Sequence, residues 1–334
     1  MKVGGDLRIT AATMWLPETR YPAARAVAAG TITAEQAAGA ACVEVPVAAA
    51  VPAWLMGSQA ARQCLGQPGV DPGELDFVAY AGMTPREEEP WSPAHRLARV
   101  LGASRAVAIG LAQMSNGGAA GIGWATALML ADDSIRYALS TTAGNFCALP
   151  YDRWQTAPAT VFGDGATAVL LGRGEGPLVI RSVGSAGRPL LEETFPAFHP
   201  FRPLPEPGSG PREDALGFAA NLKGNREVIR EAVGIALADA GLGGEDAAGD
   251  RIALVATNRL GAQVTEQTVL RALPRALRGR CRAFGAGTGH LGAGDLPANL
   301  ADILAGDLLG AGECALLIGT GAGVTAGAVV VERR

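Results

Sequence analysis

Aromatic residues are scarce in this chain, and their scarcity indicates how its interior is filled. They make up 5% of the 334 residues, whereas apolar residues as a whole make up 49%. Alanine, valine, leucine and glycine must therefore fill most of the core, which suits the close packing of helices against a sheet. A chain of this length allows two domains, or one large α/β unit with a sizeable core.

An excess of positive charge and paired cysteines are lacking too. The formal net charge is −4, so no basic surface indicates nucleic acid. No two cysteines have C-x-x-C spacing, and their number is odd, which excludes an evident zinc site or disulfide framework. The first ten residues hold no apolar run of the secretory type. We therefore expect a cytoplasmic protein without a bound metal. The five cysteines are Cys42, Cys64, Cys147, Cys281 and Cys314.

Charge is missing altogether from residues 106–131, a run long enough to cross a membrane. The run nevertheless contains five glycines and the polar residues "QMSN" at positions 113–116. This pattern favours a buried strand, turn and helix over a membrane span. We expect no association with membranes.

Apolar strand-like runs alternate with helical patterns along the chain, which is typical of α/β layers. Helices are predicted at 52–67, 92–102, 117–130, 225–241 and 296–309. Strands are predicted at 8–16, 75–83, 106–112, 135–143, 166–172, 178–184, 252–258, 282–287, 313–321 and 326–333.

The order of these elements recurs within the chain. A helix, a Gly/Asp turn and a buried strand at 59–82 reappear at 231–258. "FGDGATAVLLGR" at 162–173 and "GTGAGVTAGAVVVERR" at 319–334 both pair a glycine-rich turn with a strand. We predict two duplicated halves, an N-terminal half at 1–173 and a C-terminal half at 174–334. Residues 183–222 interrupt the pattern, with seven prolines between Pro189 and Pro211. Such a loop is either an entrance wall or lid, or a mobile surface segment.

Ser115 stands at the predicted junction between the strand at 106–112 and the following helix. Unpaired N–H groups at a helix start stabilise developing negative charge, and Gly117 and Gly118 permit close approach to the backbone. The alternative is that Ser115 or Asn116 simply caps the helix. The G-x-S-x-G pattern of α/β-hydrolases is absent, since residues 113–117 read "QMSNG".

A nucleophilic serine requires a base, and the chain has only three histidines. His95 belongs to a polar helix, and His199 to the proline-rich loop. His290 lies in "FGAGTGHLGAGD", five residues before Asp295, which is able to orient the imidazole. A structural histidine that caps a turn is the alternative. The glycine turn at 318–327 is suited to holding an oxyanion, but also to binding phosphate or to a crowded turn.

Three of these motifs, in this order, resemble the thiolase superfamily and within it β-ketoacyl-acyl-carrier-protein synthase III. They are "LGASRAVAIGLAQMSNGG" at 101–118, "FGDGATAVLL" at 162–171 and "GTGAGVTAGAVVV" at 319–331. The resemblance spans nearly the whole chain. It implies a five-layered αβαβα fold of two duplicated halves and a homodimer.

The departures from that family concern the residues that carry its chemistry. Ser115 stands at the place of the usual nucleophilic cysteine, Asn258 at that of a histidine, and His290 at that of an asparagine. "GHLGAGD" at 289–295 resembles a subgroup of acyltransferases of secondary metabolism. The resemblance thus implies Ser115 as nucleophile, His290 as base and Asp295 as its orienting partner. It further implies that the N–H groups of Ser115 and Ala322 form the oxyanion hole.

The function implied is acyl transfer from an acyl carrier protein or coenzyme A thioester to a hydroxyl or amine of a natural-product intermediate. No resident cofactor is expected, and Asn258 and His199 are possible substrate contacts. Two alternatives stay open: a starter-unit synthase of a polyketide pathway, which forms carbon–carbon bonds, and a catalytically idle partner that resembles such a synthase.

Overall fold

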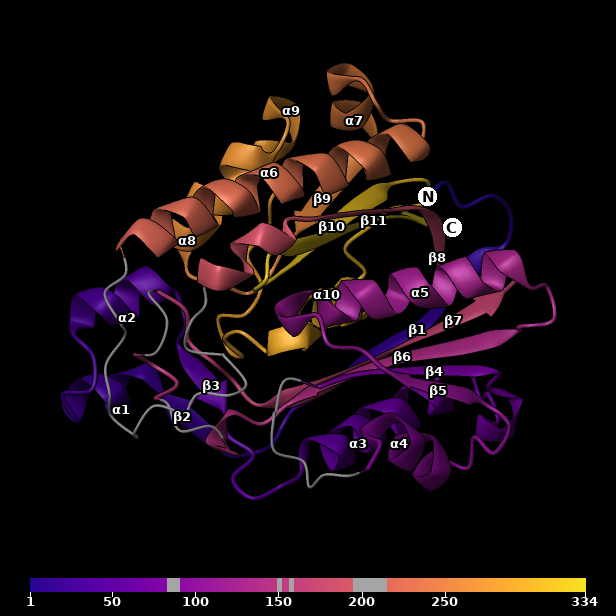
Figure 1. The fold of residues 1–334 in the computed structure, drawn as a ribbon, viewed down its shortest axis with the longest axis horizontal. Helices are drawn as coiled ribbons and strands as arrows, with labels where there is room; N and C mark the ends of the chain where they lie inside the picture. Colours follow the sequence, from indigo (N-terminus) through magenta and orange to yellow (C-terminus); the bar gives the residue numbers. More distant parts are fainter. Residues whose placement is uncertain (83–90, 149–151, 156–158, 195–214) are drawn as a thin grey trace.

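The computed structural model describes residues 1–82, 91–148, 152–155, 159–194 and 215–334. Helices and strands alternate in five layers (Figure 1). Helices α5 (Gly117–Ala131) and α10 (Asp295–Ala305) form the central layer. They lie between the two halves of one large, curved sheet. Helices α3 (Ala53–Gly66) and α4 (Pro93–Leu101) cover the first-half sheet from outside. The second-half sheet is covered by α6 (Ala215–Asp239), with α7 (Glu245–Arg251), α8 (Ala262–Thr265) and α9 (Arg275–Arg278) around it. The predicted five-layered αβαβα arrangement is therefore confirmed.

The nine strands of the large sheet follow the order β5-β4-β6-β7-β1-β8-β11-β10-β9. β1 and β8 lie side by side at its centre, but pair at only two positions, Arg8 with Val179 and Ile9 with Leu178. Beyond these pairs the two halves diverge and leave room for the central helices. The bounds are β1 (Leu7–Trp15), β4 (Phe77–Gly82), β5 (Val107–Gly110), β6 (Tyr137–Gly144), β7 (Gly165–Arg173), β8 (Leu178–Gly187), β9 (Ile252–Ala256), β10 (Cys314–Gly321) and β11 (Thr325–Arg333).

Strand order and direction repeat between the halves. β1 and β7 are antiparallel, as are β7 and β6, while β6, β4 and β5 are parallel. In the same way β8 and β11 are antiparallel, as are β11 and β10, while β10 and β9 are parallel. The division into halves at residue 174, which falls between β7 and β8, stays a prediction.

The strand predicted at 282–287 is wrong. Only one parallel bridge, between Val255 and Cys281, occupies the position that β5 has in the first half. The residues that follow form a loop with Gly285 and Gly289 at positive φ, a backbone conformation that interrupts a regular strand. This loop leads directly to His290.

Burial explains why sequence patterns alone identified most elements. β7 is buried over "GATAVLLG", since helices cover both faces of the sheet, and such strands read as continuous apolar runs. α5 is uncharged because it lies between the two sheets; the prediction of a strand, turn and helix over 106–131 is confirmed.

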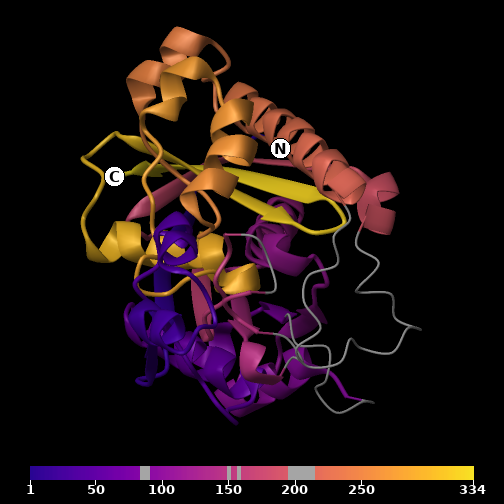
Figure 2. The ribbon, with the colours of Figure 1, turned by 90° about the vertical axis from the view of Figure 1, so that its left-hand side faces the viewer.

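Outside the layers, two short helices and a two-stranded sheet form a small lobe, which faces the viewer in Figure 2. It comprises β2 (Arg20–Pro22), α1 (Ala23–Ala28), α2 (Ala34–Ala40) and β3 (Glu44–Pro46). Thr33 begins α2 with a capping box shared with Gln36. The proline-rich loop is only partly described: β8 runs to Gly187, a 3₁₀ turn spans Pro189–Thr194, and α6 begins at Ala215. Its histidine, His199, lies outside the described residues.

Candidate active site

Ser115 lies in a single 3₁₀ turn, Met114–Asn116, between the end of β5 and the start of α5. Met114 has φ of 47°, in the left-handed region that non-glycine residues rarely adopt. This conformation turns the chain sharply just before Ser115, and such strain is concentrated at functional sites. Asn116, which directly precedes α5, makes no side-chain cap to the helix. Whether Ser115 is a nucleophile or only part of the helix start stays a prediction.

His290 is held by backbone hydrogen bonds to the motif "FGDG". Its N–H donates to the carbonyl of Val161 at 2.7 Å, and its carbonyl accepts from the N–H of Gly163 at 3.0 Å. The ring of Phe162 lies beside the imidazole, with 5.4 Å between ring centres. His290 is buried, so the orientation of its side chain is constrained on several sides.

Asp295 is the first residue of α10 and is completely buried. Its Oδ1 accepts from the N–H of Leu291, and its Oδ2 from the N–H of Arg259, both at 2.8 Å. Burial acts on this carboxyl most strongly and raises its pKa, but the attraction of His290 and Arg259, with their hydrogen bonds, outweighs it. The pKa of Asp295 is thus lowered, and the carboxylate stays ionised.

The three side chains form one connected line. Ser115 Oγ lies 2.8 Å from His290 Nε2. On the other side of the ring, His290 Nδ1 is hydrogen-bonded to Asp295 Oδ2. An ionised Asp295 accepts a hydrogen bond, so Nδ1 of His290 carries the proton that is donated to it. Nε2 then carries no proton and accepts the hydrogen bond of the serine hydroxyl. This is the arrangement in which a histidine removes the proton from a serine that attacks a carbonyl.

The two central helices bring these residues together, because their N-terminal ends meet. A Cβ on Gly118 of α5 would lie 2.5 Å from both the carbonyl oxygen of Ala293 and Cδ of Pro297 in the α10 region. Close contact of the helices therefore depends on glycine at this position. Residues 175 apart in the chain become neighbours through it.

Comparisons with known proteins show which proteins this chain resembles. No protein-family profile matches the chain. A mycobacterial β-ketoacyl-[acyl-carrier-protein] synthase III from Mycobacterium avium is 29% identical over 296 residues, covering 83% of this chain and 80% of that protein. The solved structure of the acyltransferase ChlB3 is also 29% identical and superposes with a TM-score of 0.82 over 98% of both chains. In sequence and in fold, this chain is similar to the synthase III-like group of the thiolase fold.

A further solved structure agrees in fold alone. The priming β-ketosynthase of the R1128 polyketide biosynthetic pathway is 16% identical, with a TM-score of 0.77 over 100% of this chain and 98% of that one. The resemblance that the sequence motifs indicated is confirmed for the group. The roles of individual residues in this synthase III-like chain stay predictions.

Asn258, at the place where the resemblance leads one to expect a histidine, binds the backbone on two sides of the site. Its Oδ1 accepts from the N–H of Thr320 at 2.7 Å and from the Thr320 hydroxyl at 3.1 Å. Its Nδ2 lies 3.5 Å from the carbonyl oxygen of Ser115. Asn258 thus connects the end of β10 to the serine turn.

The end of β10 lies against the same serine turn. A Cβ on Gly321 would collide with the carbonyl oxygen of Gln113 and lie 2.8 Å from the Asn116 nitrogen. Ala322 follows directly and is half-buried. The predicted oxyanion hole of Ser115 and Ala322 stays a prediction, now with the two segments known to be adjacent.

The other predicted features have simpler outcomes. His95 is exposed on α4, and its Nδ1 pairs with Ser92 Oγ at 2.8 Å. Within the described ranges, no three His, Cys, Asp or Glu side chains gather as metal ligands would. None of the described helices combines the length and apolar character that a bilayer crossing requires.

Sequence reasoning missed Arg259, which is buried at 5% exposure beside Asp295. It follows Asn258 directly, in "ATNRLG", and the only available signal was a lone arginine after a buried strand. Such a residue is expected to find partners, but the sequence does not say which ones.

Proposed function

We propose that this protein transfers an acyl group from a thioester to a hydroxyl or amine, through an ester on Ser115. The observation that carries the proposal is the 2.8 Å contact of Ser115 Oγ with His290 Nε2, with Asp295 on the far side of the ring. A serine hydroxyl is a weak nucleophile without a base held this closely. The acyltransferase ChlB3, at 29% identity, supports the reaction class.

In the first step, Ser115 Oγ attacks the thioester carbonyl while Nε2 of His290 takes the hydroxyl proton. Asp295 stabilises the imidazolium that forms. The C–S bond then breaks, the thiolate takes the proton from His290, and the acyl group is left on Ser115. In the second step an alcohol or amine loses its proton to His290 and attacks the ester, and Ser115 regains its proton as the acyl group leaves.

The negative charge that develops on the carbonyl oxygen requires donors. We assign them to the N–H groups of Ser115 and Ala322. The start of α5 adds the favourable field of a helix N-terminus. Close contact of Gly321 with the backbone of Gln113 supports this, because it holds the two donor-bearing segments beside each other.

A starter-unit synthase is the second candidate, favoured by the synthase III from Mycobacterium avium at 29% identity. A synthase of that kind must stabilise an enolate, and in the related family a histidine and an asparagine do so. Here Asn258 bonds to Thr320 and lies near the Ser115 carbonyl, while His290 pairs with Ser115 and Asp295. Both side chains are therefore engaged in other contacts, and this supports acyl transfer over decarboxylation.

The partners proposed are an acyl carrier protein or coenzyme A as donor and a small acceptor molecule. A homodimer is proposed as well. β5 is the terminal strand of the sheet, and Val107 on it is 64% exposed, while Trp124 on α5 is 54% exposed. Apolar side chains beside an open strand edge favour pairing with a second copy. Mass in solution, with Val107→Lys as the disrupting variant, tests this.

The decisive experiment is incubation with an acyl thioester, followed by intact-protein mass. A mass increase equal to the acyl group, absent in Ser115→Ala, is expected. Its absence across a panel of coenzyme A and carrier-protein thioesters would favour the idle partner.

The bond type is tested with carbon-labelled malonyl thioester and an alcohol or amine. We expect an ester or amide that keeps all malonyl carbons. Labelled carbon dioxide released in step with a lengthened chain would replace the acyltransferase with the synthase.

A further inference from the structure

Arg259 is a buried cation, and most of its donors reach the elements that carry His290 and Asp295, while Nη1 also lies 3.6 Å from Met14 Sδ on β1. Its Nε donates to Asn299 Oδ1 at 3.1 Å, and Nη1 to Thr288 Oγ1 at 2.9 Å. Nη2 forms an ion pair with Asp302 at 2.5 Å. Its backbone N–H donates to Asp295 at 2.8 Å. The guanidinium is planar, so these partners are held in a fixed arrangement.

The partners belong to two separate segments. Thr288 lies two residues before His290, while Asn299 and Asp302 lie one and two turns after Asp295 on α10. The stem of Arg259 also packs on the loop that leads to His290: a Cβ on Gly285 would lie 2.7 Å from Cβ of Arg259. One side chain thus joins the histidine loop to the aspartate helix.

We propose that Arg259 is the positioning residue of the His290–Asp295 pair: it fixes the distance between them and places a positive charge beside Asp295. This inference rests on the proposed function. Arg259 acts through Asp295 and is separated from the acyl group by that residue and His290.

Electrostatics give this role a physical reason. A carboxylate with no exposure to water is strongly disfavoured unless it is paired and hydrogen-bonded. Arg259 provides one of the two backbone donors to Asp295 and a nearby positive charge. The ionisable groups joined to Arg259 by these contacts are Asp302, Asp295 and, beyond Asp295, His290.

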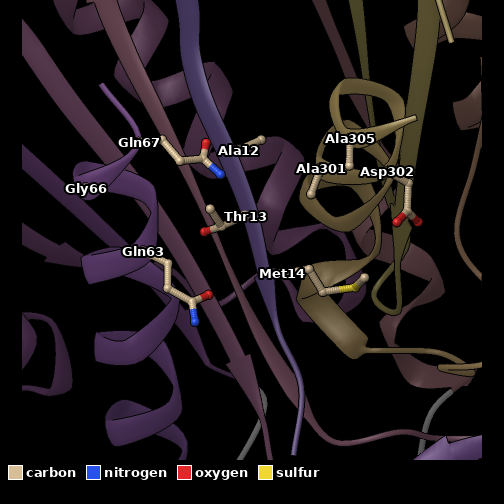
Figure 3. A pocket seen from close by; sticks show the side chains of 9 residues that line it. All are labelled: Ala12, Thr13, Met14, Gln63, Gly66, Gln67, Ala301, Asp302 and Ala305. Atoms are coloured by element: carbon tan, nitrogen blue, oxygen red, sulfur yellow. The ribbon is translucent and has the colours of Figure 1, made fainter. Parts of the chain in front are cut away.

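The outer end of this network reaches the surface. Asp302 and Met14 line an open cavity of about 520 Å³ between α3, β1 and α10 (Figure 3). The side chain of Asp302 is 33% exposed, whereas that of Arg259 is 1% exposed. Asp302 is thus the one carboxylate of the network that can be neutralised without opening the buried centre.

The test compares the rate of Ser115 acylation, and its dependence on pH, in Arg259→Met, Arg259→Lys and Asp302→Asn. Loss of the positive charge in Arg259→Met makes protonation of the pair easier, so the acid limb of the profile moves up by about one pH unit. The acylation rate constant falls roughly 100-fold at unchanged thioester affinity, because the orienting group is displaced. Arg259→Lys keeps the charge and restores part of the rate.

Asp302→Asn removes a negative charge that offsets Arg259, so the acid limb moves down by roughly half a unit. Opposite shifts distinguish an electrostatic positioning role from a loss of folding.

Arg173→Met is the matched control. Arg173 Nε donates to the Ile135 carbonyl at the end of β7. Gly165, at the opposite end of β7, is the residue that faces Leu291. The control variant leaves the profile unchanged.

An unchanged profile in Arg259→Met, or a shift in the same direction for Asp302→Asn, overturns the inference. Should Arg259→Met not fold, the direction of the shift in Asp302→Asn decides alone. Failure of the unaltered protein to form any acyl adduct is a different result, since it refutes the proposed function itself.

Discussion

The turns that precede α5 and α10 have the same backbone and different chemistry. Each is a 3₁₀ turn that continues directly into a buried helix: Met114–Asn116 before α5, and Gly292–Gly294 before α10. The first residue of each has positive φ, 47° at Met114 and 62° at Gly292. Ser115 in the first half therefore corresponds to Ala293 in the second.

What lies around the two turns explains why only one carries a hydroxyl. Gly321, the last residue of β10, packs against the serine turn, and His290 faces Ser115. Ala293 is buried, with its Cβ 3.0 Å from the position that a Cβ on Gly117 would take. The second turn thus serves as a support for the first, and its helix contributes Asp295 instead.

The halves differ again where the first has β5 and the second has one bridge at Cys281. Loss of that strand leaves residues 282–289 as a loop, and this loop supplies Thr288 and Gly285 to Arg259. The departure from repetition therefore gives the second half the loop that leads to His290 and contacts Arg259. The first half keeps a complete strand and an exposed sheet edge.

The largest expected effect tests the inequality of the two turns. Ser115→Ala abolishes the acyl adduct, and adding Ala293→Ser to it does not restore one, because residue 293 is buried away from any thioester. Ser115→Cys retains adduct formation, since a thiolate is the better nucleophile. Intact-protein mass is the measurement. An adduct on the Ser115→Ala, Ala293→Ser double variant would show that the turns are interchangeable.

The next effect concerns the second helix. His290→Ala lowers the acylation rate by about 10⁴-fold, and Asp295→Asn by somewhat less, because one removes the base and the other leaves it misoriented. The double variant is no slower than His290→Ala, since the two residues act as a unit. Rapid-mixing measurements of acylation check this. Losses that multiply would mean that Asp295 has only a structural role.

Many of the helices and strands are predictable from the sequence, because buried elements are rich in apolar residues. Continuous apolar runs identified β7 and α5, and the glycine-flanked His290 with Asp295 five residues on was evident in the chain. That Ser115 and His290 are neighbours came from resemblance, since local pattern does not encode a contact across 175 positions. The catalytic roles themselves await the experiments above.

The sequence did not reveal the features that depend on three-dimensional neighbours. Arg259 looks like an ordinary arginine until Asn299, Thr288 and Asp302 are seen around it. The strand predicted at 282–287 was wrong, because Gly285 within it has positive φ and lies against the side chain of Arg259. Positive φ at Met114 has no signal in the residue type.

A smaller effect tests the contact between the two helix ends. A methyl group on Gly118 must displace Ala293 and Pro297, so Gly118→Ala lowers the acylation rate by about 10-fold and destabilises the fold by roughly 1–3 kcal/mol. Gly234→Ala in α6 is the matched control: no atom lies within 4 Å of its Cβ, and it is neutral or stabilising. Equal behaviour of the two variants in urea unfolding and acylation would contradict the proposed dependence on close contact.

The smallest effect on activity is expected at Asp76, just before β4 in the first half, where the second half has Arg251 before β9. Burial raises the pKa of Asp76. The N–H donors of Arg136 and Tyr137 and the guanidinium of Arg105 together lower it by more, so the pKa falls below its ordinary value. A carboxyl whose folded-state pKa is lowered stabilises the fold above its unfolded pKa, near 4, and the contribution is lost as pH falls through the folded value. Asp76→Asn therefore lowers the free energy of unfolding by about 1–2 kcal/mol at pH 7, and the difference from the unaltered protein shrinks below about pH 4.

The rate of Ser115 acylation stays unchanged in this variant, because the Asp76 contacts hold the end of the first-half sheet and none of them reaches the serine turn. Urea unfolding at several pH values, with acylation measured on the same samples, checks both parts. A difference in stability that persists unchanged at pH 3 would mean that the ionised carboxylate is not its source. A fall in acylation would mean that Asp76 acts through the site and that the two halves are coupled more tightly than their separate contacts indicate.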